Sequence, residues 1–253
     1  MNGGFSVDLN KETIEKIESM AAATTYRIGN GEYADKELKL IYEFPDRPRS
    51  IEFSSLDSIV KAIKTEIERV TVPLFVNVAS PVSVSVFTTY REDMERDVLY
   101  SASPDLPNDK IGVWLRSEDA IISMRSRFIQ NSDSAYVVDL LSSISDEKSV
   151  ASNDNGMTQT VNVKQGIALQ SKKTVKPRVK LAPYRTFLEV EQPESEFLLR
   201  VRPGDREKEI PVSVCIFEAD GGAWKLQARH NIAEYFNEHL KELIEAGKVV
   251  VTE

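Results

Sequence analysis

A run of basic side chains between residues 172 and 185 is the stretch whose residue types could do chemistry. On a β-strand, Lys176, Arg178 and Lys180 share one face because side chains alternate. Such a face could follow the phosphates of a nucleic acid while an aromatic ring stacks on a base. The candidate anion-binding residues, with Phe187 close by, are Lys172, Lys173, Lys176, Arg178, Lys180, Tyr184 and Arg185. The alternative is a solvated strand whose lysines protect a sheet edge from pairing.

The charge of the whole chain works against non-specific binding to nucleic acid. Its 253 residues hold 32 basic and 40 acidic side chains, a net charge of −8 with a pI near 5.1. Residues 1–150 carry 17 basic and 25 acidic side chains, so all of the net negative charge lies there. The composition therefore predicts weak binding to single-stranded nucleic acid at best, and no binding to an anionic membrane.

The chain's cysteine and two histidines do not form a known catalytic or metal-binding pattern. Cys215 lies in the apolar run PVSVCIF, which is typical of a small buried side chain rather than a nucleophile. His230 and His239 are nine residues apart, too far for two ligands on one helical face. A triad with Glu218 could be assembled, but its nucleophile would lie in the middle of an apolar strand.

Known nucleotide-binding and hydrolase motifs are also missing from the sequence. Neither GxxxxGK[ST], GxGxxG nor GxSxG occurs. Acidic residues gather at 92–97 and 189–196, and we interpret both groups as solvated rims, with a metal site as the alternative. The sequence thus predicts a non-enzymatic protein without cofactor or metal, and a hydrolase lacking a recognised motif remains a third hypothesis.

The elements that would position these residues begin with an acidic α/β half over residues 1–152. Apolar spacing, capping residues and glycines indicate its helices, strands and turns. The predicted elements are a helix from Asp8 or Asn10 to residue 23, a hairpin with strands 24–28 and 37–42, a strand 50–53, a helix capped by Ser54 that ends near residue 70, strands 73–79, 82–89 and 98–101, a helix 118–129 capped by Ser117, and a helix that begins at Asp133 and ends at residue 145.

A β-rich half follows the loop at residues 146–156, with the boundary placed near residue 152. The triplet Asp220-Gly221-Gly222 is typical of a hairpin turn. The predicted elements are strands 157–169, 178–190, 196–202, 210–218 and 224–230, a closing helix 232–246 ended by Gly247, and a terminal strand 248–252. The fold class is therefore α+β, with mostly antiparallel sheets and about four or five amphipathic helices. The halves 1–152 and 153–253 form two domains or one continuous domain.

The expected compartment is the cytosol. The start MNGGFSVDLNKE has no basic and apolar regions of the kind a signal peptide needs. No apolar run approaches the roughly 20 residues that span a bilayer. One cysteine allows no internal disulfide.

The stretch KPRVKLAPYRTFLEVEQPESEFLLRVR, followed by WKLQARH and a closing helix, resembles the YfdQ-like family of phage and prophage proteins. PDRPRSIEF, a capped helix and PLFVNV are similar too, so the resemblance spans residues 40–247. It implies a protein of uncharacterised activity in the host bacterial cytosol and supplies no binding residues. The leading hypothesis is a binding protein that contacts a host or phage protein, or weakly a single-stranded nucleic acid. The alternative is a structural phage protein that forms homo-oligomers through its sheet edges.

Overall fold

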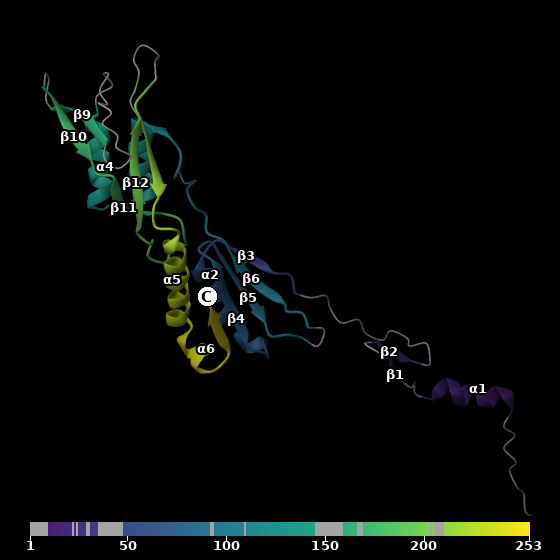
Figure 1. Ribbon diagram of the computed structural model, residues 1–253. Coiled ribbons are helices and arrows are strands. Elements are labelled where there is room, and N and C mark those ends of the chain that lie inside the picture. The colour runs from purple at the N-terminus through teal and green to yellow at the C-terminus, as the bar shows by residue number, and fades with distance from the viewer. Residues whose placement is uncertain are drawn as a thin grey trace, which may run out of the picture. The chain divides into compact units, whose positions relative to one another are not determined.

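The computed structural model describes residues 10–21, 23, 25–28, 31–34, 48–91, 94–108, 110–144, 159–165, 169–202, 204 and 210–253 (Figure 1). The chain divides into two compact units, Met1–Asp46 and Arg47–Glu253. Helices and strands alternate irregularly and the C-terminal half is rich in strands, which confirms the predicted α+β class.

The first unit contains one helix and one hairpin. Helix α1 (Lys11–Met20) begins at Asn10, whose Oδ1 accepts a hydrogen bond from the Thr13 amide at 2.9 Å, as predicted. Strands β1 (Thr25–Ile28) and β2 (Gly31–Ala34) pair antiparallel. The first predicted strand is confirmed as β1, but its hairpin partner is β2, which begins directly at Gly31. The strand predicted at 37–42 lies outside the described residues.

The second unit has two lobes, each built around its own sheet and core. The first lobe is a five-stranded sheet in the order β14-β4-β5-β6-β3, with β14 parallel to β4 and β3 parallel to β6. Its elements are β3 (Ile51–Phe53), α2 (Leu56–Glu66), η1 (Ile67–Arg69), β4 (Leu74–Ser80), β5 (Ser83–Thr88), β6 (Val98–Ala102), α6 (Lys241–Glu245) and β14 (Val249–Thr252).

One face of this first sheet packs on helices, as the alternation of valine and polar residues predicts. Val76, Val86 and Ile59 have no exposed surface and belong to one apolar core. Ser55 rather than Ser54 caps α2, since its side chain accepts a hydrogen bond from the Ser58 amide. The predicted terminal strand is confirmed as β14, and Gly247 precedes it with a φ of +70°.

The second lobe is an antiparallel sheet in the order β7-β13-β12-β11-β8, with two helices against one face. Its elements are β7 (Leu115–Arg116), α3 (Ser117–Arg127), β8 (Phe128–Ile129), α4 (Ser132–Ser143), β9 (Gln159–Gln165), β10 (Leu169–Val175), β11 (Arg178–Pro183), β12 (Ser195–Arg202) and β13 (Ser213–Glu218). The two predicted helices are confirmed, although their starts differ. Ser117 is already inside α3, and Asn131 rather than Asp133 caps α4 through a reciprocal pair with Ser134.

Two predicted strands of the second lobe are shorter than expected. The run 157–169 becomes β9, which turns back to pair with β10 as a hairpin. The run 178–190 ends as a strand at Pro183, and the following segment 184–194 crosses to the first lobe. Proline carries no amide hydrogen, so a strand readily stops there.

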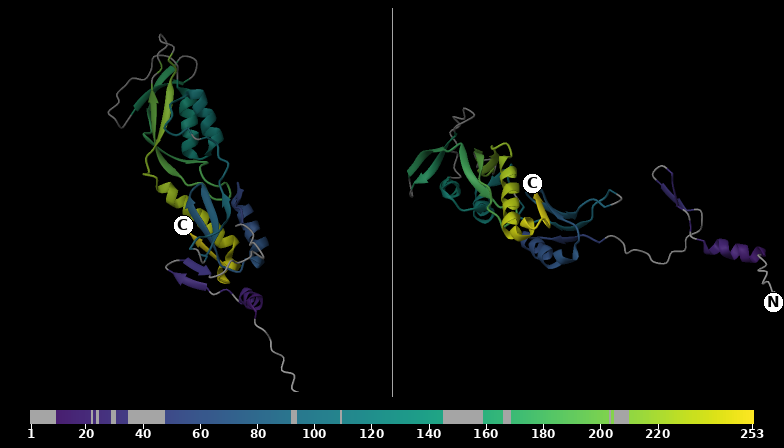
Figure 2. Two further views of the ribbon diagram at one scale, coloured as in Figure 1. Left: turned by 90° about the vertical axis from the view of Figure 1, so that its right-hand side faces the viewer. Right: turned by 90° about the horizontal axis from the view of Figure 1, so that it is seen from below.

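The strand predicted at 224–230 is wrong, because these residues form the start of helix α5 (Ala223–His239). The Asp220 side chain accepts hydrogen bonds from the amides of Gly222 and Trp224, which turns the chain into a helix rather than a hairpin. Figure 2 shows α5 running from the second lobe along the first.

The two cores do not follow the order of the chain. The first-lobe core contains Phe187 and Phe236 together with Val76. The second-lobe core joins Leu140 to Phe197. The boundary predicted near residue 152 itself lies outside the described residues, and side chains from both sides of it pack together in both cores.

A basic sheet face as the candidate functional site

The second-lobe sheet turns one face to helices α3 and α4 and the other face outward. Val179, Leu199 and Ile216 point to the helices and are buried. Residues paired across neighbouring strands lie on the same face. The pairs Lys180–Glu196, Arg178–Leu198, Leu198–Phe217, Arg200–Cys215, Arg202–Ser213 and Ser213–Arg116 all occupy the outward face. We call the cations of this surface the basic face: Arg116, Arg178, Lys180, Arg200 and Arg202.

Few carboxylates share the paired positions of the basic face. Among the described positions of β7, β11, β12 and β13 on this side, Glu196 is the carboxylate, and it lies 2.6 Å from Arg178. The Arg178 side chain is 59% exposed, so water screens this pair strongly. Arg116, Lys180 and Arg202 are exposed. The described pairing positions of this face therefore hold more cations than carboxylates.

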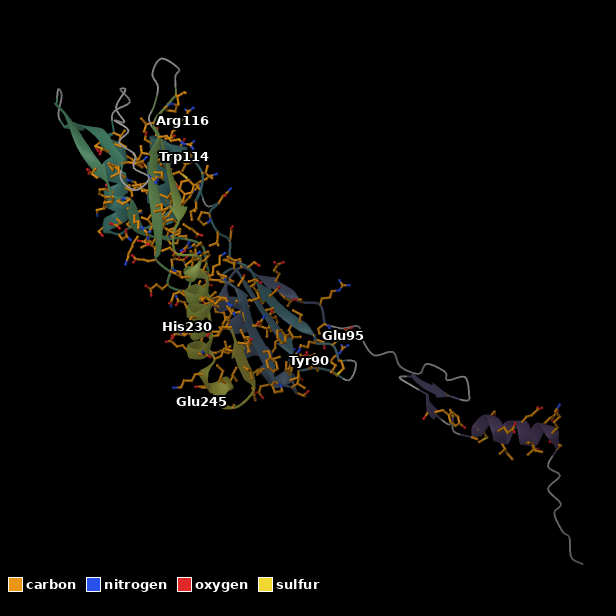
Figure 3. The ribbon with its side chains drawn as sticks, viewed as in Figure 1. Tyr90, Glu95, Trp114, Arg116, His230 and Glu245 are labelled. Atoms are coloured by element: carbon orange, nitrogen blue, oxygen red, sulfur yellow. The ribbon has the colours of Figure 1, made fainter. Side chains whose placement is uncertain are left out.

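Two aromatic rings lie among these cations. The Arg202 guanidinium carbon is 3.7 Å from the ring centre of Trp114, the residue just before β7. Phe217 meets the same ring edge-on at 6.2 Å and remains 37% exposed. Figure 3 shows Trp114 and Arg116 close to each other at the end of this lobe. Stacking orients the Arg202 side chain without removing its charge.

The basic face has an acidic boundary. From Glu196 to Arg202 strand β12 extends roughly 20 Å, at about 3.4 Å per residue. At its Glu196 end lies a hollow of ≈ 300 Å³, which is lined by Lys180 and Glu196 of this face together with Glu194, Asp220 and Trp224. Burial alone would raise the pKa of the Asp220 carboxyl, but hydrogen bonds from Ser195 and two backbone amides outweigh it and hold this pKa below its ordinary value. An anionic chain is therefore favoured more at the Arg202 end of β12 than at this end, where Lys180 lies among carboxylates.

The predicted binding residues separate into three groups. Lys172 and Lys173 lie on β10, and their side chains are outside the described residues. Lys176 turns away to α4, where its Nζ lies 3.4 Å from Asp133 and 4.7 Å from the ring centre of Tyr136. Arg178 and Lys180 are the two predicted cations that the structure places on the basic face.

Tyr184 and Arg185 lie beyond the end of β11 and away from that face. Tyr184 is half-buried. Arg185 is 5% exposed, donates a hydrogen bond to Glu218 at 2.7 Å and another to Ser195. Its guanidinium carbon also lies 3.8 Å from the ring centre of Trp224. Arg185 therefore stabilises the junction of the lobes and is not available to a ligand.

Sequence reasoning missed five members of the site: Arg116, Arg200, Arg202, Trp114 and Phe217. The alternation in EFLLRVR does place Arg200 and Arg202 on one face, so the two arginines of β12 could have been found. The others arrive through pairing of β13 with β7 and β12, which joins residues far apart in the sequence.

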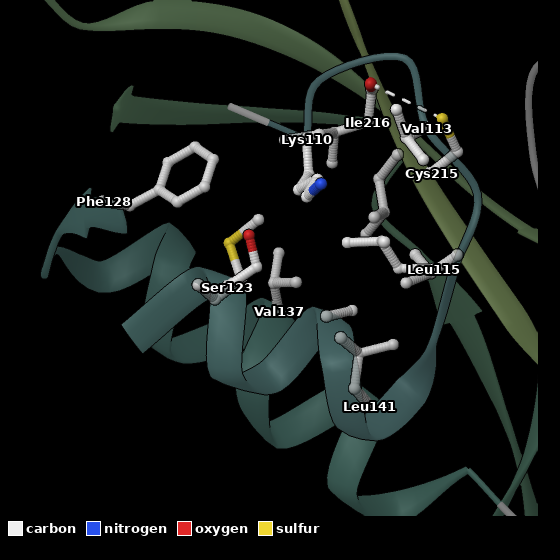
Figure 4. A pocket seen from close by; sticks show the side chains of 13 residues that line it. Lys110, Val113, Leu115, Ser123, Phe128, Val137, Leu141, Cys215 and Ile216 are labelled. Atoms are coloured by element: carbon white, nitrogen blue, oxygen red, sulfur yellow. Dashed lines mark hydrogen bonds between the residues drawn. The ribbon is translucent and has the colours of Figure 1, made fainter. Parts of the chain in front are cut away.

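Cys215 and the histidines do not assemble a reactive centre among the described residues. Cys215 is 2% exposed, as predicted, and burial raises the pKa of its thiol although Arg202 partly lowers it. It borders an apolar cavity of ≈ 20 Å³, space for a single water molecule (Figure 4). His230 faces Glu234 at 3.3 Å, and His239 stacks on Tyr235 on the same helix.

Metal and membrane features are likewise missing from the described part of the chain. It holds no group of three or more His, Cys, Asp or Glu side chains that could bind a metal ion. It also contains no helix of the length and apolarity that crossing a membrane requires.

In comparison with known proteins, the chain matches no family model, no curated protein and no solved structure. The resemblance to the YfdQ-like family therefore stays a prediction. The function has to be argued from the charges and geometry of the basic face.

Proposed function

We propose that the protein is a non-enzymatic binding protein whose basic face contacts the phosphate backbone of a nucleic acid. The observation that carries the proposal is five cations against one carboxylate on a single sheet face. This excess is local, because the whole chain has a net charge of −8. The setting in a phage-infected bacterial cytosol rests on the resemblance alone.

The physical driving force is the release of counterions from the phosphates. Each phosphate contact on a single strand contributes about −0.7 to the slope of log affinity against log salt. Acidic side chains elsewhere repel the ligand within the Debye length of about 8 Å at physiological salt, so contact is confined to the basic face. We expect weak binding without sequence preference, with a Kd of about 10⁻⁴ to 10⁻⁶ M.

The test removes charge from the basic face and measures binding of a labelled 20-nucleotide strand by fluorescence anisotropy. The variant R116Q/K180Q/R202Q should lose about 100-fold in affinity at 50 mM salt, and its salt slope should be shallower by about 2. The variant K61Q/K64Q/K241Q changes the net charge equally but at exposed lysines of first-lobe helices. That control should keep most of the affinity.

Two results would reject the proposal. One is a wild-type protein that shows no salt-dependent binding near 50 mM salt. The other is a control variant that loses as much affinity as the basic-face variant, because net charge rather than the face would then explain binding. Either result leaves a host or phage protein as the partner, and a pull-down from infected cells would be the next experiment.

The alternative of self-assembly through sheet edges has less geometric support. The edge strands of the two five-stranded sheets are short: β3 has three residues, β14 four, and β7 and β8 two each. Short edges offer few backbone groups to a second chain. Light scattering at high protein concentration tests this alternative, which predicts an oligomer.

A further inference from the structure

Phe217 is the exposed aromatic side chain within the basic face. It pairs with Leu198, which pairs in turn with Arg178 on the next strand. Arg200 lies diagonally across from it, opposite Cys215. Arg202 already covers the ring of Trp114. Phe217 meets that ring edge-on, with an angle of 70° between the two ring planes. The Phe217 ring is therefore the aromatic surface left to a ligand here.

The outward face of the sheet does not suit the usual way in which proteins read a duplex. At any one level it is about three strands wide, because β7 pairs only with Ser213 and Val214, and β8 only with Ala182 and Pro183. The major groove of B-DNA, about 12 Å wide, admits a helix or a two-stranded ribbon, which is narrower than three paired strands. A duplex could touch the basic face only with its outer phosphates, and its paired bases would stay out of reach of Phe217.

We infer that the nucleic acid bound here is single-stranded, with phosphates on the arginines and lysine and an unpaired base stacked on Phe217. The inference rests on the proposed function and adds the ligand class and a residue that contacts a base. A flexible strand can follow β12 and turn one base onto the Phe217 ring on the neighbouring strand, diagonally across from Arg200. Stacking of this kind tolerates any base, because every base has an aromatic face.

The experiment compares a labelled 20-nucleotide thymidine strand with a hairpin duplex of equal nucleotide number, both at 50 mM salt. Phe217→Leu removes the ring but keeps an apolar side chain beside Leu198 and Trp114. It should weaken single-strand binding about 5- to 100-fold and change duplex binding by less than about twofold. Because the cations remain, the salt slope should stay the same. Phe217→Tyr keeps an aromatic ring and should bind nearly as tightly as wild type.

The matched control is Phe75→Leu on the outward side of the first-lobe sheet. Phe75 is half-buried and stacks on Phe87 with ring centres 5.7 Å apart. Its replacement should leave binding unchanged, and thermal unfolding of every variant verifies that the fold is intact. A uridine strand measured in parallel separates RNA from DNA as the preferred source of the bases.

The outcomes distinguish a failure of the stacking inference at Phe217 from a failure of the proposed nucleic-acid binding by the basic face. Undiminished single-strand binding by Phe217→Leu, with loss in R116Q/K180Q/R202Q, overturns the stacking inference and leaves the proposed function standing. Equal wild-type affinity for duplex and single strand also overturns it. If wild type binds neither probe, the proposed function fails and this inference fails with it.

Discussion

The two sheets of the second unit share an architecture but present opposite surfaces. On the first-lobe sheet the outward pairs Phe75–Phe87, Asn77–Ser85 and Ser85–Ser101 are uncharged, and Ser101 also pairs with the exposed Glu52. Arg96 is held there over the rings of Phe75, Phe87 and Tyr90, at 5.0, 5.0 and 3.9 Å. The second-lobe sheet presents arginine and lysine at the equivalent outward positions. The difference shows that the ligand is set by side chains on a face and not by the fold that carries it.

The lobes also differ in how their cores are completed. The second-lobe core lies within residues 120–216. The first-lobe core begins with residues 56–102 and then needs Phe187, α5 and Val249. Thr186 marks this crossing with a hydrogen bond of 2.6 Å to the Pro81 carbonyl. The first lobe is thus the one that depends on distant parts of the chain, and stability measurements can test that dependence.

The largest expected effect is on Phe187, which comes from the second half of the chain but has no exposed surface in the first-lobe core. Phe187→Ala should lower the free energy of unfolding by about 3–5 kcal/mol, because it leaves a cavity. Urea denaturation measures this loss. The neighbouring Leu188 is 64% exposed, so Leu188→Ala should change stability by less than about 0.5 kcal/mol. Equal effects at the two positions would contradict the crossing described here.

A smaller effect is expected from two arginine–glutamate pairs of similar length. Arg185–Glu218 spans 2.7 Å at the lobe junction, and Arg178–Glu196 spans 2.6 Å on the basic face. The arginine side chains are 5% and 59% exposed. Arg185→Met should cost about 3 kcal/mol, because Ser195 and Glu218 lose a buried partner.

The exposed pair provides the comparison for that measurement. Arg178→Met should cost less than about 1 kcal/mol in the same urea experiment, because water replaces the lost contact. A loss as large as that of Arg185→Met would show that burial does not separate the two pairs. It would also remove the argument that Arg185 belongs to the junction rather than to the basic face.

A smaller effect than those of Phe187→Ala and Arg185→Met is expected at Cys215. Cys215→Ala should lower stability by about 1 kcal/mol and leave nucleic-acid binding intact, and Ser should cost more if its hydroxyl finds no partner. Burial raises the pKa of the Cys215 thiol above its ordinary 9.0. The contribution of the protonated thiol to the stability of the fold is therefore complete below pH 9 and is lost as the pH rises further.

The pH dependence of Cys215 can be separated from that of two tyrosines. Burial also raises the pKa values of Tyr100 and Tyr235 above their ordinary 10.0, so both lower stability as the pH approaches 10, but equally in wild type and in Cys215→Ala, and their effect cancels in the comparison. Wild type should lose stability more steeply in that interval than Cys215→Ala, as followed by urea denaturation. Thiol alkylation of the native protein as fast as that of the unfolded chain would show that Cys215 is not buried in solution.

Local signals in the sequence predicted most elements, and pairing between distant residues explains the failures. The alternating valines of β5 and the glycine after α6 were sufficient to predict that strand and that helix end, because each pattern depends on only a few neighbouring residues. The triplet Asp220-Gly221-Gly222 gave a wrong prediction, because it suits a hairpin turn as well as the start of a helix. Here the Asp220 side chain accepts a hydrogen bond from the Trp224 amide, and the chain continues as a helix. The apolar residues that distinguish the two, Ile232 and Phe236, lie further along α5.

The candidate site was predictable only where it lies on one strand. Arg178 and Lys180 alternate on β11 and were found from spacing alone. Arg185 was included among the candidate anion-binding residues because the run of cations continues to it, whereas the strand ends at Pro183 and its partner Glu218 is 33 residues away. Arg116 and Phe217 join the site through sheet pairing, which no local pattern records.

The crossing of the chain between lobes has a consequence for synthesis on the ribosome. Strands β3 to β6 are made first, yet Val249, which completes their core, follows Ala102 by about 150 residues. At 5–20 residues per second that delay is roughly 7–30 s. Throughout it the valine-rich face of the nascent sheet lacks Phe236 and β14, so the lobe that starts first is finished last. Part of the valine-rich face of the newly made chain therefore stays uncovered until its final strand is added.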